Sequence, residues 1–341
     1  MKKMLWPAMM TGLVLVLSVT SCRKKDNCAD VNPNCRYDLN ALKKTDTNLL
    51  IKAGVSYIKP AMSNLTALAV DGADSIIVGS RTGIEIIGTN GTRLSRFTVG
   101  MPVSCLAAAT GADEDFVPLN GPGWDGRFRT RLLGGDVFVG QKDHIEVYGQ
   151  DGTRKAVWKS PDPKTELTSI AVSRQFVYAA DCVNRIVWRF SIAGVLLGRV
   201  GAKDNDRRKN GFVVPSAFFD VAVSRDGSLL AANPGEHRIE HFTADGTFMA
   251  SWGRASLEAD GFCGCCNPSN FAIMPDGSFV TSEKHIVRVK IYDAAGGFKG
   301  IISGQEEWPK EAIGLDLAVD SRGRIFVLDP QADVVRVYTR K

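Results

Sequence analysis

The feature of this sequence that most constrains its fold is a motif repeated about every 40 to 50 residues. Each copy has a strand of small apolar residues, a turn rich in Asp and Gly, a second strand, a polar loop, a third strand of β-branched and aromatic residues, a glycine turn and a fourth strand. Four copies begin at Leu65, Leu167, Phe218 and Ser269, and two degenerate copies span Ser104–Ser160, which contains an insertion, and Leu315–Lys341. The chain therefore contains six similar units.

Six units of four short antiparallel strands predict an all-β fold, a six-bladed β-propeller. Such blades bury their faces against one another and leave only short, protected edges. The last unit stops after its third strand, and a strand-like run, Asn48–Ile58, is left over before the first unit. We therefore predict that this N-terminal strand pairs with Val334–Thr339 in the C-terminal blade and closes the ring.

Two segments point to a family. "MPDGSFVTSEKHIVRVKIYDAAG" (Met274–Gly296) and "VDSRGRIFVLDPQADVVRVYT" (Val319–Thr339) resemble NHL repeats. This resemblance, which covers the chain from about Leu65 to its end, implies a six-bladed propeller. It implies no single activity, because propellers of this kind serve as binding modules, lyases and hydrolases.

The first 22 residues indicate the compartment. Lys2 and Lys3 precede an apolar run, Leu5–Leu17, that is too short to remain as a membrane span, and small residues follow. Val19–Cys22 resembles the lipobox of bacterial lipoproteins, in which the cysteine is acylated and becomes the new N-terminus. We therefore expect a signal peptide at 1–21 and lipid attachment at Cys22. The alternative is plain secretion, with Cys22 as a free thiol or a disulfide partner.

The next segment, 22–47, is polar and charged and leads to the propeller at 48–341. We interpret it as a lipid-anchored tether with a small disulfide loop between Cys28 and Cys35. Arg23, directly after the acylated cysteine, is similar to the residue found in lipoproteins sent to the outer membrane. The expected location is therefore the cell envelope, on the periplasmic side of the outer membrane.

Charge and motifs exclude several classes of protein. Loss of the signal peptide, which contains Lys2 and Lys3, lowers the formal net charge from +5 to +3, too little to indicate a nucleic-acid partner. The sequence contains no nucleotide-binding loop, no HExxH and no GxSxG. We expect a monomer whose partners are the membrane, through the lipid, and an envelope protein or a small-molecule ligand.

Propeller topology predicts where unusual residues gather. Loops between second and third strands lie on the same face as the crossings between blades, and that face carries the longest connections. Loop-rich faces commonly carry function. The residues expected near this mouth of the central channel are Cys105, His144, Cys182, His237, Cys263, Cys265, Cys266, Glu283, Lys284 and His285.

The cluster "GFCGCCNPSN" (Gly261–Asn270) has three interpretations. In an oxidising envelope Cys263 could form a structural disulfide with Cys266, Cys182 or Cys105. Clustered thiolates could instead bind zinc, copper or iron, with His285 or Cys182 completing the ligand set. The third interpretation is a reactive thiol or dithiol, which needs a nearby positive charge.

The other candidates also have two interpretations each. His144 and His237 begin third strands and are either rim histidines or ligands. Glu283 and Lys284 are either a solvated salt bridge or an acid and a base. No full catalytic constellation is present. We therefore predict a membrane-anchored binding or scaffold protein. The alternative is a metal- or dithiol-dependent redox protein, or a metal-dependent hydrolase or lyase.

Overall fold

A computed structural model describes residues 45–109, 135–201, 211–264, 266–309 and 312–340. The signal peptide, Cys22, the pair Cys28 and Cys35, most of the tether, the insertion in the second unit and Cys265 lie outside these residues. Predictions about them remain predictions. Among the described residues, no helix has the length and apolar character needed to cross a membrane.

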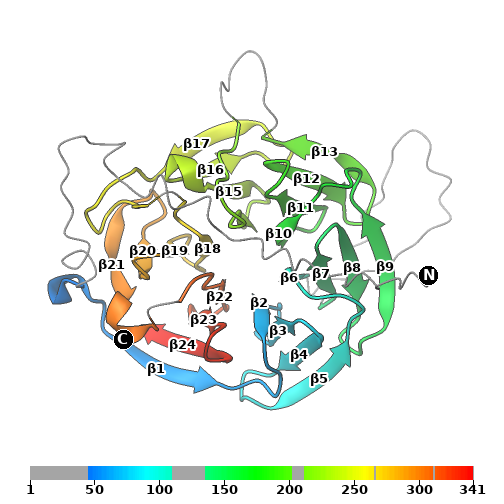
Figure 1. Cartoon of the computed structure of the whole chain (residues 1–341), viewed down its shortest axis with the longest axis horizontal. Coiled ribbons are helices and arrows are strands. Elements are labelled where there is room, and N and C mark those ends of the chain that lie inside the picture. The colour runs from blue at the N-terminus through cyan, green and yellow to red at the C-terminus, as the bar shows by residue number, and fades with distance from the viewer. Residues whose placement is uncertain (1–44, 110–134, 202–210, 265, 310–311, 341) are drawn as a thin grey trace, which may run out of the picture.

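The described residues form a ring of six sheets, each of four antiparallel strands (Figure 1). From the inside outward, blade 1 contains β2 (Leu65–Val70), β3 (Ile76–Ser80), β4 (Gly83–Ile87) and β5 (Arg93–Thr98); blade 2 contains β6 (Cys105–Ala108), β7 (Val137–Gln141), β8 (His144–Tyr148) and β9 (Arg154–Lys159); blade 3 contains β10 (Leu167–Val172), β11 (Phe176–Asp181), β12 (Ile186–Ser191) and β13 (Leu196–Val200). Blade 4 contains β14 (Val221–Val223), β15 (Leu229–Asn233), β16 (Arg238–Phe242) and β17 (Phe248–Trp252); blade 5 contains β18 (Asn270–Ile273), β19 (Phe279–Ser282), β20 (Val289–Tyr292) and β21 (Phe298–Ser303). The all-β, six-bladed prediction is confirmed.

Blade 6 closes the ring as predicted. Its strand order is β22 (Leu317–Val319), β23 (Ile325–Asp329), β24 (Val334–Arg340) and then β1 (Ala53–Ile58) from the N-terminal side. β1 and β24 are antiparallel, with Ala53 opposite Arg340 and Ile58 opposite Val335. The strand begins later than expected, because Thr47–Leu49 forms the 3-10 helix η3. Two further 3-10 helices are η4 (Pro234–Glu236) and η5 (Gln305–Glu307).

Packing between blades explains why the repeat folds only as a ring. Tyr178 of blade 3 is fully buried and shares a core cluster with Val221 and Phe242 of blade 4. Trp252, at the end of β17, packs on Tyr292 of blade 5 with ring centroids 5.0 Å apart. Each sheet therefore buries apolar surface against its neighbours, which is the main favourable term in such a fold.

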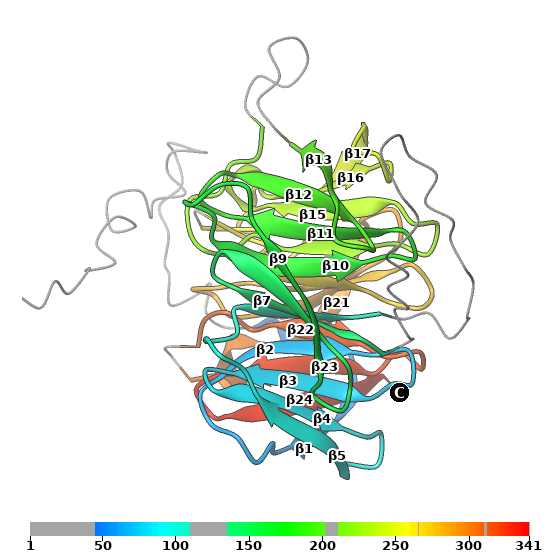
Figure 2. The same cartoon turned by 90° about the vertical axis from the view of Figure 1, so that its right-hand side faces the viewer.

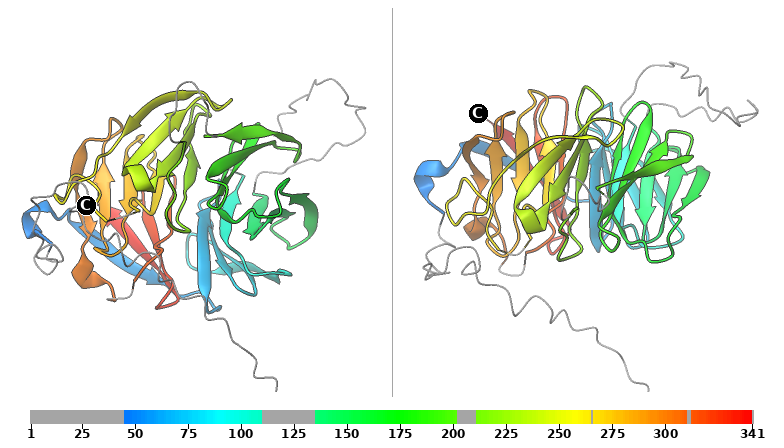
Figure 3. Two further views of the ribbon diagram at one scale, coloured as in Figure 1. Left: turned by 45° about the horizontal axis from the view of Figure 1, so that its top comes forward. Right: turned by 90° about the horizontal axis from the view of Figure 1, so that it is seen from above.

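The strands run across the thickness of the ring, between two faces (Figures 2 and 3). First-to-second turns of the form Asp-Gly lie on one face; Gly227 and Gly277 adopt φ +82° and +84° there, a region that favours glycine. The inner strands begin at the opposite face, where blade crossings and second-to-third loops also lie. We call this opposite face the loop-rich face.

Candidate ligand-binding site

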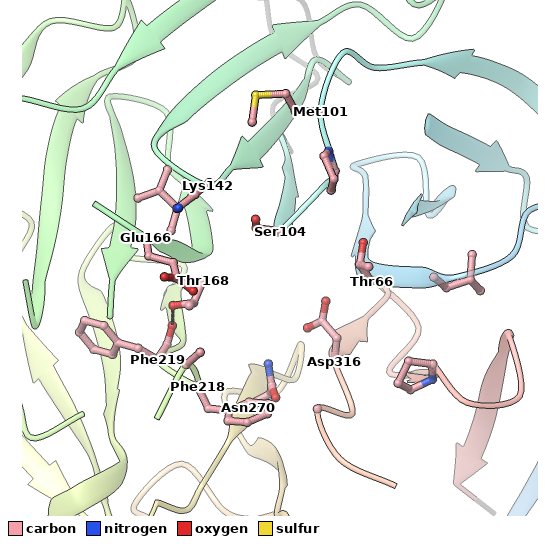
Figure 4. A pocket seen from close by; sticks show the side chains of 16 residues that line it. Thr66, Met101, Ser104, Lys142, Glu166, Thr168, Phe218, Phe219, Asn270 and Asp316 are labelled. Carbon is pink, nitrogen blue, oxygen red and sulfur yellow. Dashed lines mark hydrogen bonds between the residues drawn. The ribbon is translucent and has the colours of Figure 1, made fainter. Parts of the chain in front are cut away.

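A cavity of about 720 Å³ opens at the loop-rich face of the channel (Figure 4). All six blades contribute to its lining, which consists of Leu65, Thr66, Met101, Pro102, Ser104, Lys142, Glu166, Leu167, Thr168, Ala217, Phe218, Phe219, Asn270, Gly314, Asp316 and Pro330. Lys142 comes from a second-to-third loop, Met101 from a blade crossing and Thr168 from an inner strand. Second-to-third loops and blade crossings therefore lie together on one face, as predicted.

The cavity wall is mixed in character. Its lining includes the apolar side chains of Phe218 and Leu167 and the hydroxyl groups of Thr66, Ser104 and Thr168. Thr168 Oγ1 donates a hydrogen bond to the carbonyl oxygen of Phe219, 2.7 Å away, and so joins blades 3 and 4. A concave site of this size, with several convergent polar groups in an apolar wall, is typical of small-ligand binding.

One position of the repeat recurs around the channel. Pairing with the second strand aligns Ala67, Cys105, Ser169, Asp220, Asn270 and Asp316, one from each blade in chain order. We call these six residues the channel ring. Blades 1 to 3 supply an alanine, a cysteine and a serine, whereas blades 4 to 6 supply three side chains with carboxylate or amide oxygens.

Asp220 joins three blades. Its Oδ1 accepts hydrogen bonds from Ser169 Oγ in blade 3 at 2.6 Å and from its own neighbour Val221 N at 2.9 Å. Its Oδ2 accepts from Phe271 N in blade 5 at 2.7 Å. Burial raises the pKa of Asp220 to about 6, although these hydrogen bonds oppose the shift.

Asp316 has the same role at the closure of the ring. Its Oδ2 accepts a hydrogen bond from Leu68 N of blade 1 at 2.7 Å, and its Oδ1 accepts from Leu317 N at 2.9 Å. Burial, and then the charge of Asp220, raise the pKa of Asp316 to about 7. Asp316 is partly buried and lines the cavity, so a ligand there can contact it. The charge of this contact therefore changes near neutral pH.

Cys105 is a buried free thiol in the channel ring. Burial raises its pKa, and the charges of Asp316 and Asp220 raise it further, so the thiol stays protonated at neutral pH. Gly140 lies opposite it, and a Cβ at Gly140 would overlap Cys105 Sγ.

Cys182 is also a buried free thiol, whose pKa is raised to about 12 by burial and by Glu166 and Asp181. Neither cysteine is therefore bonded to Cys263.

The side chain of Asn267 fixes the cysteine loop, Gly261–Asn270, to the backbone of blade 5. Asn267 Nδ2 donates to the carbonyl oxygens of Cys263 at 2.6 Å and Lys284 at 3.1 Å, and Asn267 Oδ1 accepts from Lys284 N at 2.9 Å. His237 Nε2 of blade 4 forms a short hydrogen bond with the Gly264 carbonyl oxygen. A Cβ at Gly264 would lie 3.9 Å from His285 Cδ2. The structure therefore brings His237 and His285 to this loop, but not to the cavity lining.

Glu283 and Lys284 do not pair with each other. Glu283 Oε2 lies 2.7 Å from Arg288 Nε and 3.2 Å from Lys290 Nζ, and all three side chains are buried. Lys290 Nζ also donates to the Gly261 carbonyl oxygen at 2.6 Å, and burial lowers its pKa to about 8. This buried ion cluster attaches the start of the cysteine loop to blade 5. It is not the solvated salt bridge that the sequence suggested.

Lys284 extends away from Glu283, toward the segment that leads into blade 4. Its Nζ donates to Ser216 Oγ at 2.9 Å and lies 4.7 Å from the centre of the Phe218 ring. It therefore supports a residue of the cavity wall without lining the cavity itself. His144 is elsewhere on blade 2, where its Nδ1 lies 2.8 Å from Asp143 Oδ1 beside a second pocket of about 350 Å³.

The proposed metal site is only partly covered by the described residues. Within residues 45–109, 135–201, 211–264, 266–309 and 312–340, no group of three or more His, Cys, Asp or Glu side chains is arranged to hold a metal ion. Cys263 and Cys266 are buried. Cys265 lies outside the described residues, so a site that uses all three cysteines remains a prediction.

Asp220, Asn270 and Asp316 were not predicted from the sequence. The signal was present, because the aligned inner strands "FDVAV" and "LDLAV" each place an aspartate in an otherwise apolar stretch. None of the predicted residues that the structure describes lines the cavity, although Cys105 directly follows Ser104, which does.

A scan of protein-family models finds none that matches the chain, and a search of curated proteins finds no similar sequence. Solved structures do resemble it. A streptogramin B lyase has a TM-score of 0.54 at 13% identity over 85% of this chain and 98% of that one. Virginiamycin B lyase from Staphylococcus aureus has a TM-score of 0.53 at 11% identity, over 85% of this chain and 100% of that one. A protein of unknown function from Bacteroides thetaiotaomicron VPI-5482 has a TM-score of 0.53 at 12% identity, over 85% and 76%.

These likenesses show the fold alone, because the identities are low. The fold and the cavity define this protein as a six-bladed β-propeller with a concave site at one mouth of its channel.

Proposed function

We propose that this protein is a cell-envelope β-propeller, built from NHL-like repeats and held at a membrane by a lipid on Cys22, that binds a small molecule at its loop-rich face. The observation that supports this most is the cavity of about 720 Å³, to which all six blades contribute. Its volume suits a small molecule better than a protein segment, and the hydroxyl, amide and carboxyl groups in its wall can orient a ligand.

A blocking variant tests this function. Ser104 is exposed and lines the cavity, so Ser104→Trp should fill part of it without disturbing the core. Ser56→Trp makes the same change at an exposed position on the outermost strand β1 and serves as the control. Full-length protein is purified from its native membranes, and released small molecules are identified by mass spectrometry. We expect a compound that is present with the wild type and Ser56→Trp and is lost with Ser104→Trp. An identical set of compounds from all three would contradict the proposal.

The lipid anchor has a separate test. Intact mass measurement of the membrane-extracted protein should show a chain that begins at Cys22 and carries acyl groups. Cys22→Ser should appear in the soluble envelope fraction. A mature chain that begins elsewhere, with no acyl mass, would contradict the anchor and leave the cavity proposal untouched.

A second candidate function is a lyase or hydrolase, and Asp316 favours it. A carboxyl group with a pKa of about 7 that faces a cavity is suited to act as a general base near neutral pH. Two structurally similar proteins are named as lyases. The compound found in the blocking experiment is incubated with the wild type and with Asp316→Asn. Conversion that rises through pH 7 and is lost in the variant supports catalysis, whereas an unchanged compound supports binding alone.

A further inference from the structure

Three consecutive blades place oxygen-bearing side chains along the channel wall. Asp220, Asn270 and Asp316 occupy the same position of the repeat in blades 4, 5 and 6. Asn270 and Asp316 line the cavity, and both are labelled in Figure 4. Asp220 lies close enough for its charge to raise the pKa of Asp316. This side of the channel is therefore rich in hydrogen-bond acceptors and in negative charge.

Asn270 provides an independent sign of a missing partner. Its Oδ1 is a buried atom, and none of the described residues donates a hydrogen bond to it. Buried polar atoms in folded proteins are nearly always hydrogen-bonded, so this acceptor lacks a partner that the described residues do not supply. Because Oδ1 is enclosed, a turn of the amide about χ2 is needed to bring it to the cavity, where water or a ligand can donate to it.

The charged groups around Asp316 favour a cation as that ligand. Asp220 and Cys105 face it within the channel, and Lys142 and Glu166 lie at the cavity rim. The protonated Cys105 contributes no charge, and the two rim groups are of opposite sign. The net charge next to Asp316 is therefore negative whenever Asp220 is ionised.

The arrangement suits an ammonium group better than a metal ion. Ala67 offers no ligand, and Cys105 remains a thiol because its pKa is raised. Each carboxylate oxygen of Asp220 and Asp316 already accepts a backbone hydrogen bond. Ca²⁺ and Mg²⁺ take six or more oxygen ligands in a compact shell, and Zn²⁺ binds mostly through thiolate and imidazole groups. A primary ammonium needs only three acceptors, and its charge disperses over three N–H donors.

We propose that the cavity selects small molecules that carry a protonated primary amine on an apolar body. The amine donates to Asp316 and, once the Asn270 amide has turned, to Asn270 Oδ1, in the field of Asp220. The apolar body packs on Phe218, Leu167 and Leu65. This deepens the proposed function, because it names the ligand class of the same cavity. Residues of both kinds line the same cavity, and Phe218, Asn270 and Asp316 are labelled around it in Figure 4.

Calorimetric titration of the full chain with three matched probes tests this inference. The probes are 2-phenylethylammonium, the neutral 2-phenylethanol and the anionic 3-phenylpropionate. We expect the ammonium to bind about tenfold to a hundredfold more tightly than the alcohol, which is the range for a hydrogen bond to a charged group. We expect 3-phenylpropionate to bind least. Because Asp316 must be ionised, the affinity for the ammonium should rise about tenfold between pH 6 and pH 8.

Variants locate the binding site. Asp316→Asn should lower the affinity for the ammonium at least about tenfold and reduce its pH dependence to the smaller part that Asp220 supplies. Asp276→Asn removes an exposed carboxylate from a turn on the opposite face. It should change neither the affinity for the ammonium nor the pH dependence of that affinity. The pH dependence of the wild type keeps the test valid if Asp316→Asn fails to fold. Equal affinity for the ammonium and the alcohol would overturn the inference, and so would tighter binding of Mg²⁺ or Zn²⁺ with displacement of the ammonium.

The same titrations separate this inference from the proposed function. If the alcohol or the carboxylate binds as well as the ammonium, and Ser104→Trp abolishes that binding, the cavity binds small molecules but does not select amines. If no probe of any charge binds and Ser104→Trp also leaves the set of co-purified compounds unchanged, both proposals are wrong.

Discussion

Substitution of Asp316 by Asn should make the protein less stable at acidic pH and more stable at alkaline pH. The first effect follows from its hydrogen bonds, and the second follows from its raised pKa. The carboxylate accepts backbone hydrogen bonds on both oxygens, from Leu68 N and Leu317 N. An asparagine side chain has one oxygen, so one of these N–H groups loses its partner. At acidic pH, where the folded Asp316 is protonated and its hydroxyl oxygen accepts only weakly, that loss costs about 0.5–1.5 kcal/mol of the free energy of unfolding.

The second effect depends on pH. The folded-state pKa of Asp316 is about 7, against 3.8 for an unperturbed carboxyl group. Between these pH values the folded protein binds a proton that the unfolded chain does not. Its stabilising contribution is complete below pH 3.8 and is lost as the pH rises through 7. The loss amounts to at most about 4 kcal/mol, since one pKa unit corresponds to about 1.4 kcal/mol. Asp316→Asn has no such loss.

The free energy of unfolding of the variant minus that of the wild type should therefore rise by up to about 4 kcal/mol from pH 4 to pH 8 and change sign from negative to positive. Urea unfolding followed by tryptophan fluorescence at pH 4, 6 and 8 measures it. Asp276→Asn, on an exposed turn, should show no such rise. In an Asp220→Asn background the rise should be smaller, because the neighbouring charge is absent. A difference that stays constant within about 1 kcal/mol would refute the burial and coupling of Asp316.

Two further predictions concern stability. Glu283→Gln should lower the free energy of unfolding by about 3–5 kcal/mol, because it leaves Arg288 and Lys290 buried without their carboxylate. Adding Lys290→Met to this variant should restore part of the lost stability. Glu258→Gln, at an exposed position, is the control and should not change the free energy of unfolding. A Glu283→Gln variant as stable as the wild type would contradict the ion cluster. Gly140→Ala should cost about 1–3 kcal/mol through overlap with Cys105 Sγ, and Cys105→Ala should relieve it. Gly100→Ala, which has open space around its Cβ position, is the matched control, and equal effects of the two alanine substitutions in urea unfolding would show that the overlap is absent.

The blades could be predicted from sequence because each is specified locally. Turn glycines such as Gly227 and Gly277, and the alternation of strands around them, define four-stranded units within a single repeat. The closing strand was predictable for a similar reason, since a unit that lacks its fourth strand leaves an unpaired edge next to β24.

The site depends on contacts between distant parts of the chain, which local patterns do not reveal. Asp316 binds Leu68 N across 248 positions, and its pKa depends on Asp220 in another blade. Histidines and cysteines were predicted as site residues because of their chemistry. In the structure, however, His237 and Asn267 hold the cysteine loop and do not line the cavity. Glu283 and Lys284 were grouped as neighbours, but successive side chains at a strand end point to opposite sides and find different partners.

The most direct test of the account is a crystal structure of the protein with 2-phenylethylammonium. We expect the ligand in the cavity, with its nitrogen about 2.7–3.2 Å from a carboxylate oxygen of Asp316 and from Asn270 Oδ1, and with its ring against Phe218. A ligand bound beside His144 or at the cysteine loop, with the cavity holding only water, would contradict it.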